Sequence, residues 1–393
     1  MKKLMLFFLC SSLLCVYGKA QIVINTNQVE NFHNLMKYCE EKAGGKLSCK
    51  DVDEEEVQAV FEKNAKDSRL NLLIDNLLNS SVLYSPKNMK DVSIVPDEIE
   101  GRVAYKVAFT LLPDFCIDIT GGMTERWVKY WNSKYWELVE NVVRELNANK
   151  NEIIENVNAE CKALLPNDAD MNIEISLNII IDGNKGCFEF DNNVMMEMVD
   201  ARFVDFSYFI NCLKHETHHV YYKKWLAEKT SNKERNEIEN YFYEFQENFI
   251  LEGIAQRYNY NNYSSEIKQM YANRELIKEL FDEWISLIRA VKGNSPLEVF
   301  FAYQENEYNN GVKWFEKYYP GNINSPEYDR PTIIYYLSYN IYNSIFESAG
   351  YEKLKYAIEN PDKLLLIYNE LHADSMVVPR IPDDVVTLWQ NNF

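Results

Sequence analysis

The sequence predicts an α+β fold that is predominantly α-helical, with a small β-sheet before one histidine-rich helix and a helical subdomain at the C-terminal end. Two observations predict this fold. Apolar residues recur at three- and four-residue spacing along most of the chain, which is the period of amphipathic helices. The strand signal is concentrated in residues 172–200, where Asn172–Gly183 alternates apolar and polar side chains with the two-residue period of half-buried strands.

Residues 1–20 have the composition of a secretory signal peptide. Lysines at positions 2 and 3 precede an apolar run from Leu4 to Val16, and the small-residue sequence "GKA" ends at Ala20. The apolar run is short for a membrane span, so we expect cleavage after Ala20, export to the periplasm or medium, and no stable membrane insertion. A lipid anchor on Cys10 or Cys15 is the alternative, disfavoured because a bulky leucine precedes each.

Charge and cysteine content exclude some classes of protein. The formal net charge is −19, and removal of the three lysines in residues 1–20 makes it −22. Such an acidic surface argues against binding to nucleic acid or to anionic membranes. Six cysteines remain after export, so a full set of disulfides and a set of mostly free thiols with one bridge are both open. Cys39 and Cys49 are the closest pair, on either side of a plausible loop.

The helical and strand patterns divide the chain into four parts. Residues 1–20 are the signal peptide, and 21–115 form a mostly helical region of unknown role. Residues 116–260 carry the strands and the histidine-rich helix, and 261–393 form a helical subdomain. Strands are expected within Asn172–Gly183, Gly186–Phe190 and Val194–Asp200. Helices are expected over Thr124–Leu146, Asn151–Leu165, Val204–Lys229, Lys233–Asn259, Ser265–Val291, Pro296–Tyr319 and Pro331–Ser348.

Three of the five histidines lie in "HETHH", residues 215–219. The pattern satisfies His-Glu-x-x-His through His215, Glu216 and His219. On a helix, residues four apart lie about 40° apart around the axis, so the two imidazoles converge on one metal ion. Glu216 lies about 100° from His215 and about 60° from His219, beside the ion, where a carboxylate takes a proton from water.

The third histidine has to be assigned separately. If His215 and His218 were the ligand pair, Glu216 would point about 130° away from the midline of the pair. Only the pair of His215 and His219 places the base beside the ligands, so we expect His218 to lie behind them or at the surface. The apolar stripe of this helix indicates a buried element: Phe206, Phe209, Ile210, Leu213, Val220, Tyr221 and Trp225.

The next helix is expected to supply the third ligand of a zinc ion, since a catalytic zinc takes three protein ligands. It offers three glutamates: Glu244, Glu247 and Glu252. Gly253 and Ala255 beside Glu252 would let this helix press against the histidine helix, which singles out Glu252. A tight helix crossing without a metal is the alternative. Gln256, one turn on, is expected to hydrogen-bond a ligand histidine.

These motifs resemble those of the gluzincin metallopeptidases, which carry His-Glu-x-x-His on one helix and a ligand glutamate on the next. More narrowly, "HETHH" followed by "ILEGIAQRY" is similar to zinc-dependent peptidases of bacterial exported proteins, which pair the motif with an "EGxA" helix. The segment Tyr335–Glu370 is similar to the closing helices of that group, a Tyr-x-x-Gly and then a Gly-x-x-x-Leu stretch. Tyr335 matches the tyrosine, and Ser338 stands at the first glycine.

The resemblance, which covers Asn172 to Glu370, implies a zincin-like core and a role for each residue. His215, His219 and Glu252 would hold one Zn²⁺ per chain, and Glu216 would be the general base. The edge of the sheet would pair with an extended peptide substrate. Tyr335 is the first choice to stabilise the oxyanion, followed by Tyr336, Tyr339 and His372.

Two other functions stay open at the level of sequence. One is an exported zinc-binding or scaffold protein with a vestigial site, and the other is a zinc hydrolase of a non-peptide amide. The intact Glu216 argues against a purely structural zinc, because structural sites close all four positions with Cys and His.

Overall fold

The computed structural model describes residues 21–50, 52–80, 96–117, 123–181, 186–198, 201–290, 303, 309–318 and 331–393 of the 393-residue chain. The expected signal peptide lies outside the described residues, and so does much of the helix expected over Pro296–Tyr319. Within that segment, residues 309–318 are helical. None of the described helices combines the length and the apolar character that crossing a membrane requires.

The predicted fold class is confirmed: helices dominate, and the described strands form one four-stranded sheet. The chain divides into two compact units. The sheet unit comprises residues 21–155 and 174–213, and the motif unit comprises 156–173 and 214–393. Two of the boundaries fall inside helices α8 (Lys150–Leu164) and α9 (Phe206–Thr230), and the third lies between residues 173 and 174. The four-part division of the chain stays a prediction.

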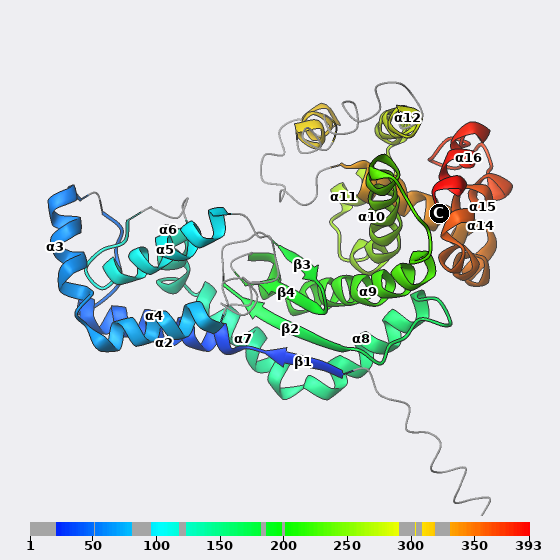
Figure 1. Ribbon diagram of the computed structural model, residues 1–393. Coiled ribbons are helices and arrows are strands. Elements are labelled where there is room, and N and C mark those ends of the chain that lie inside the picture. The colour runs from blue at the N-terminus through cyan, green and yellow to red at the C-terminus, as the bar shows by residue number, and fades with distance from the viewer. Residues whose placement is uncertain are drawn as a thin grey trace, which may run out of the picture. The chain divides into compact units, whose positions relative to one another are not determined.

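The sheet has the strand order β1-β2-β4-β3 (Figure 1). Its strands are β1 (Gln21–Asn25), β2 (Glu174–Ile180), β3 (Cys187–Phe190) and β4 (Asn193–Glu197). β1 and β4 run parallel to the central β2, and β3 pairs antiparallel with β4. Strand β1 was not predicted, because region 21–115 was expected to be mostly helical. Its five residues gain their ladder partners from β2, about 150 positions further along the chain, and no local pattern reveals that pairing.

The helices of the sheet unit pack around aromatic side chains. They are α2 (Asn27–Ala43), α3 (Glu54–Asn64), α4 (Ser68–Ser80), α5 (Pro96–Leu111), α6 (Met123–Trp131) and α7 (Tyr135–Ala148), followed by the start of α8. Phe32, Phe109 and Trp127 are buried and in ring contact. The single helix expected over Thr124–Leu146 is wrong: it breaks between α6 and α7, where Ser133 Oγ accepts the N–H of Tyr135.

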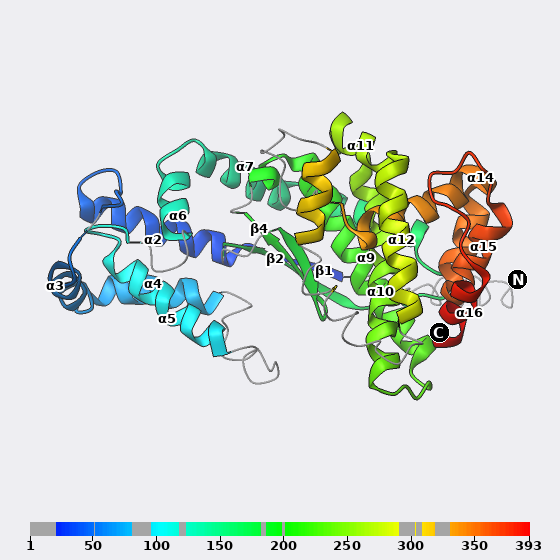
Figure 2. The same cartoon turned by 90° about the horizontal axis from the view of Figure 1, so that it is seen from above.

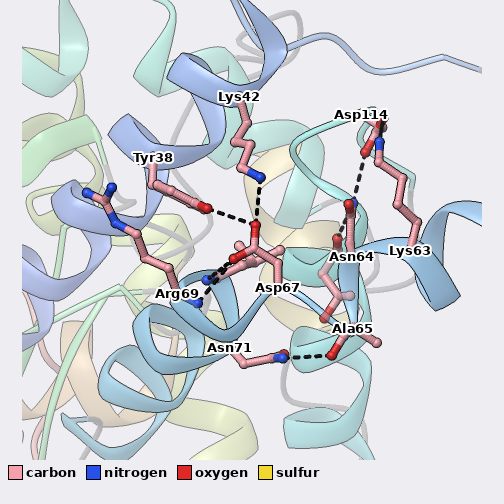
Figure 3. A network of polar contacts seen from close by, with 11 residues as sticks. Tyr38, Lys42, Lys63, Asn64, Ala65, Asp67, Arg69, Asn71 and Asp114 are labelled. Carbon is pink, nitrogen blue, oxygen red and sulfur yellow. Dashed lines mark hydrogen bonds and ion pairs between the residues drawn. The ribbon is translucent and has the colours of Figure 1, made fainter.

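A polar network around Asp67 joins α2 and α4 (Figure 3). One oxygen of Asp67 accepts the backbone N–H groups of Arg69 and Leu70 and so caps α4. Its other oxygen accepts the Tyr38 hydroxyl at 2.8 Å and forms an ion pair with Lys42 at 2.8 Å. The network therefore ties the start of α4 to the last two turns of α2.

The sheet unit also contains a disulfide between Cys49 and Cys116. Backbone hydrogen bonds support it on both sides, from Lys50 N to the Cys116 carbonyl and from Cys116 N to the Ser48 carbonyl. Cys39, the nearest cysteine to Cys49 in the sequence, is buried and not disulfide-bonded, and the same is true of Cys161 and Cys212, while Cys187 is half-buried. Among the described residues, which include all six cysteines expected after export, the structure has the pattern with a single bridge.

The motif unit is helical in its described residues. The helices α14, α15 and α16 gather on one side of α10 (Figures 1 and 2). The helix expected over Ser265–Val291 is interrupted at Asn273, whose side chain accepts the N–H groups of residues 275 and 276 and starts a new helix. The elements are α10 (Glu237–Tyr260), α11 (Ser265–Tyr271), α12 (Arg274–Ala290), the π-helix η4 (Ile333–Leu337), α14 (Ser338–Glu359), η5 (Pro361–Lys363), α15 (Leu364–Leu371) and α16 (Asp383–Asn392).

Candidate metal centre

The two predicted ligand histidines lie together on the buried part of α9. Their rings are 4.5 Å apart between centroids and nearly perpendicular, at 87°. Each residue is only 4% exposed. The i, i+4 spacing on a regular helix is sufficient to bring the two side chains to the same face.

Helix α10 brings Glu252 to the two histidines. One oxygen of Glu252 lies 2.9 Å from Nε2 of His215, and the other lies 3.3 Å from Nε2 of His219. The ligand atoms of the three residues all lie within 4.8 Å of one another, and this is the one such group of three or more among the described residues. Glu244 is exposed and Glu247 half-buried, and neither belongs to the group.

The donor set fits a zinc ion. Both ring nitrogens of His219 and one oxygen of Glu252 are buried without a hydrogen-bond partner among the described residues. Ligand atoms about 2 Å from a shared tetrahedral ion lie roughly 3.3 Å from one another, close to the two distances given above. Burial alone would raise the pKa of the Glu252 carboxyl, but the imidazoles of His219 and His215 hold it well below its ordinary value. Glu252 is therefore an anionic oxygen donor.

Glu216 lies at the side of this cluster. It is 6% exposed, and one of its oxygens is 4.0 Å from Nε2 of His215. Helix geometry predicts this placement, since Glu216 follows His215 directly and lies about 100° around the axis. The carboxylate therefore lies beside the three-residue cluster and is not one of its members.

His218 points away from the cluster and caps another helix. It is fully buried, and its Nε2 lies 3.1 Å from the carbonyl oxygen of Leu164, the last residue of α8. The carbonyls of residues 162, 163 and 165 accept hydrogen bonds from Lys355, and Tyr351 also donates to that of residue 163. Burial lowers the pKa of His218 to about 3, so it is a neutral donor. The surface position considered for His218 is wrong, because the end of α8 needs a buried donor.

Gly253 has a different neighbour from the one expected. A Cβ at this position would lie 2.8 Å from Cβ of Ser338 and 2.8 Å from Cδ2 of Tyr342, both on α14. The close approach is thus between α10 and α14, and the expectation that Gly253 lies against the histidine helix is wrong. The reason is angular: Gly253 lies about 100° around α10 from Glu252, so the two residues face different partners.

Ser338 stands at the first glycine of the two stretches by which Tyr335–Glu370 was compared with the zinc-dependent peptidases. It is fully buried, and its hydroxyl donates to the carbonyl of Ile334. Ser338 on α14 and Gly253 on α10 therefore pack against each other in one contact between the two helices. Gly350, the glycine of the second stretch, has φ 77° and kinks α14 just before Tyr351 and Lys355.

The hydrogen bond expected from Gln256 is made instead by Asn259. The Gln256 side-chain oxygen accepts the Tyr263 hydroxyl at 2.7 Å. Asn259 Nδ2 lies 3.0 Å from Nδ1 of His215, and both residues are buried. Sequence reasoning missed Asn259 because it considered only the next turn. Asn259 is seven residues after Glu252, which returns it to within about 20° of the same helix face.

The four candidates for oxyanion stabilisation have different environments. Tyr335 is half-buried in η4, and Thr332 caps that helix by accepting the N–H of Tyr335. Tyr336 and Tyr339 are buried in a ring cluster, where Tyr336 stacks on Tyr271 with centroids 3.9 Å apart. His372 is half-buried at the end of α15 and contacts the ring of residue 368.

Two histidines and a glutamate from neighbouring helices, with a further carboxylate beside them, define the class of a mononuclear metal site built on a helical α+β scaffold. The chain belongs to the family described as "Putative zinc dependent peptidase (DUF5700)", which matches residues 54–374. No curated protein and no solved structure matches it. The family description indicates a hydrolase that uses zinc and acts on peptides, and zinc suits the donors found here.

Proposed function

We propose that the protein is an exported zinc metallopeptidase of the gluzincin type. The observation that carries the proposal is the convergence of His215, His219 and Glu252 with Glu216 at their side. The three donors would hold one Zn²⁺ per chain. The family supports a zinc peptidase, and the donor set supports the gluzincin subtype, in which the third ligand is a glutamate.

Each residue then has a role in hydrolysis. A bound zinc ion supplies Lewis acidity, which makes water more acidic and polarises a carbonyl. Glu216 accepts the proton of the attacking water and delivers it to the nitrogen of the leaving amine. The near absence of solvent around Glu216 strengthens its interaction with the developing positive charge on that nitrogen.

Tyr335 remains the first choice to stabilise the oxyanion. Tyr336 and Tyr339 are buried in ring stacks, whereas Tyr335 keeps part of its surface accessible. A donor to a developing oxyanion must be able to reach the substrate, so accessibility supports Tyr335 over its neighbours.

The test compares wild type with Glu216→Gln. The amide is nearly isosteric but cannot take a proton, so zinc content should stay at one per chain while hydrolysis of casein falls by at least about 100-fold. Glu244→Gln, on the exposed side of α10, is the matched control and should keep full activity. Substantial activity in Glu216→Gln contradicts the mechanism. Zinc without activity in the wild type, on casein and on a panel of non-peptide amides, indicates a vestigial site.

Export is a separate part of the proposal. Its support is the lysine pair, the apolar run and the small-residue sequence ending at Ala20. Expression of the full chain in a Gram-negative host, followed by N-terminal sequencing of the periplasmic fraction, should give a chain that starts at Gln21. A cytoplasmic protein that keeps its first residues contradicts export and leaves the zinc chemistry untouched.

A further inference from the structure

The two ligand histidines are held differently. Nδ1 of His215 has Asn259 at 3.0 Å, whereas Nδ1 of His219 is buried without a hydrogen-bond partner among the described residues. The hydrogen bond of His215 is itself buried, with Asn259 only 7% exposed. A buried hydrogen bond of this kind fixes both the rotation of the ring and the nitrogen that carries the proton.

The direction of this hydrogen bond sets the tautomer of the neutral His215 ring. The amide group Nδ2 faces the ring, so it donates to Nδ1, and the proton of the neutral ring is then on Nε2. Nε2 is also the nitrogen that faces Glu252, at 2.9 Å. In this arrangement Nε2 and the carboxylate oxygen of Glu252 face each other directly.

Binding of a metal ion through Nε2 requires the other tautomer of His215. Nε2 must then offer its lone pair, so the proton has to lie on Nδ1, which becomes a donor. An asparagine amide can meet this change by turning through about 180°, because its oxygen and nitrogen ends have nearly the same size. The amide oxygen would then accept from Nδ1, and the buried contact would be kept.

The geometry points to Asn259 as the positioning residue of the metal centre, an amide that serves His215 in both tautomers and reverses its hydrogen bond when zinc binds. This inference rests on the proposed zinc site. It assigns no role to Gln256, the residue one turn from Glu252, whose oxygen is taken by Tyr263. Asn259 acts through His215 and need not contact the substrate.

Zinc affinity of the purified chain tests the inference, measured by competition with a chromogenic chelator. Asn259→Leu removes both the donor and the acceptor and should weaken zinc binding by about 10- to 100-fold. Asn259→Asp can only accept, which suits the zinc-bound tautomer, so its affinity should equal or exceed that of the wild type. Gln256→Leu is the matched control and should stay within about threefold of the wild type.

A spectroscopic measurement separates positioning from general stability. The chain has five histidines, so the ring ¹⁵N resonances of His215 can be assigned by substitution. On addition of Zn²⁺ the proton of His215 should move from Nε2 to Nδ1 in the wild type, and in Asn259→Asp it should lie on Nδ1 before zinc is added.

The outcomes are distinguishable. Asn259→Asp with weaker zinc binding than the wild type overturns the inference, and so does Asn259→Leu within threefold of the wild type. If Asn259→Leu does not fold, the aspartate variant and the ring resonances decide the matter alone. A wild-type chain that binds no zinc overturns the proposed function itself, and with it this inference.

Discussion

Replacement of Gly253 by alanine tests how α10 is placed beside α14. The new Cβ would lie 2.8 Å from Cβ of Ser338 and 2.8 Å from Cδ2 of Tyr342. Carbon atoms in contact are ordinarily about 3.5–4.0 Å apart, so the two helices must separate by roughly 0.7 Å or more. The Ser338 Cβ cannot rotate away, because it is attached directly to the backbone of α14.

The expected change in the free energy of unfolding of Gly253→Ala follows from two opposing effects. Alanine in a helix interior is favoured over glycine by about 1 kcal/mol. Overpacking a buried contact costs about 1–3 kcal/mol, and two contacts at 2.8 Å put Gly253→Ala at the upper end. We therefore expect a net loss of about 2 kcal/mol in the free energy of unfolding. Because Glu252 precedes Gly253 in the chain, zinc affinity should also fall by about tenfold.

The assay is urea denaturation of the metal-free chain in a double-mutant cycle. Gly253→Ala in a Ser338→Gly background should be nearly neutral, giving a coupling of about 1–2 kcal/mol, since only the ring of Tyr342 then has to move. Ser338→Ala is the control: it keeps Cβ, so Gly253→Ala should stay destabilising in that background. If Gly253→Ala were instead more stable than the wild type by about 1 kcal/mol, the helix preference of alanine alone, the close packing of α10 against α14 would be refuted.

The remaining predictions concern the third histidine, the α2–α4 network and the cysteines. His219→Ala should lose zinc in a chelator titration, whereas His218→Ala should keep a zinc affinity within about tenfold of the wild type. His218→Ala should instead lower the free energy of unfolding by about 1–3 kcal/mol, because the carbonyl of Leu164 loses its donor. Asp67→Ala should lower the free energy of unfolding by about 2 kcal/mol in chemical denaturation, because the cap of α4 and the Tyr38 hydrogen bond are lost. Asp75→Ala, which breaks the exposed ion pair with Lys106, is the control and should lower it by less than about 1 kcal/mol. The ion pair with Lys42 is the largest cause holding the pKa of Asp67 well below its usual value. Its contribution to stability is therefore present above about pH 4 and is lost as the pH falls further. The denaturation curves of wild type and Asp67→Ala should converge in acid, and a constant difference between them would contradict this. A thiol assay of the denatured, unreduced protein should find four thiols after export, or six if residues 1–20 with Cys10 and Cys15 remain. Reduction of the disulfide, whose cysteines are 67 residues apart, should lower the free energy of unfolding by up to about 4 kcal/mol.

The local part of the candidate metal centre follows from the sequence alone. The spacing of His215 and His219, and the place of Glu216 beside them, depend only on the rotation of about 100° per residue that every α-helix shares. The fold class likewise follows from the two periods of apolar residues, because burial of one face is decided locally. These features are encoded within single helices and strands, and the structure shows them as expected.

Contacts between elements were decided only by the tertiary structure. Gly253 pointed to a close helix approach, but which helix approaches depends on the packing of the unit, and the neighbour is α14. Asn259 and His218 have polar partners 44 and 54 residues away in sequence, so no local pattern identifies their roles. The same holds for strand β1 and for Cys116 as the partner of Cys49. A helix fixes the angle at which a side chain leaves its axis, while the partner that it meets there is selected by the packing of the whole chain.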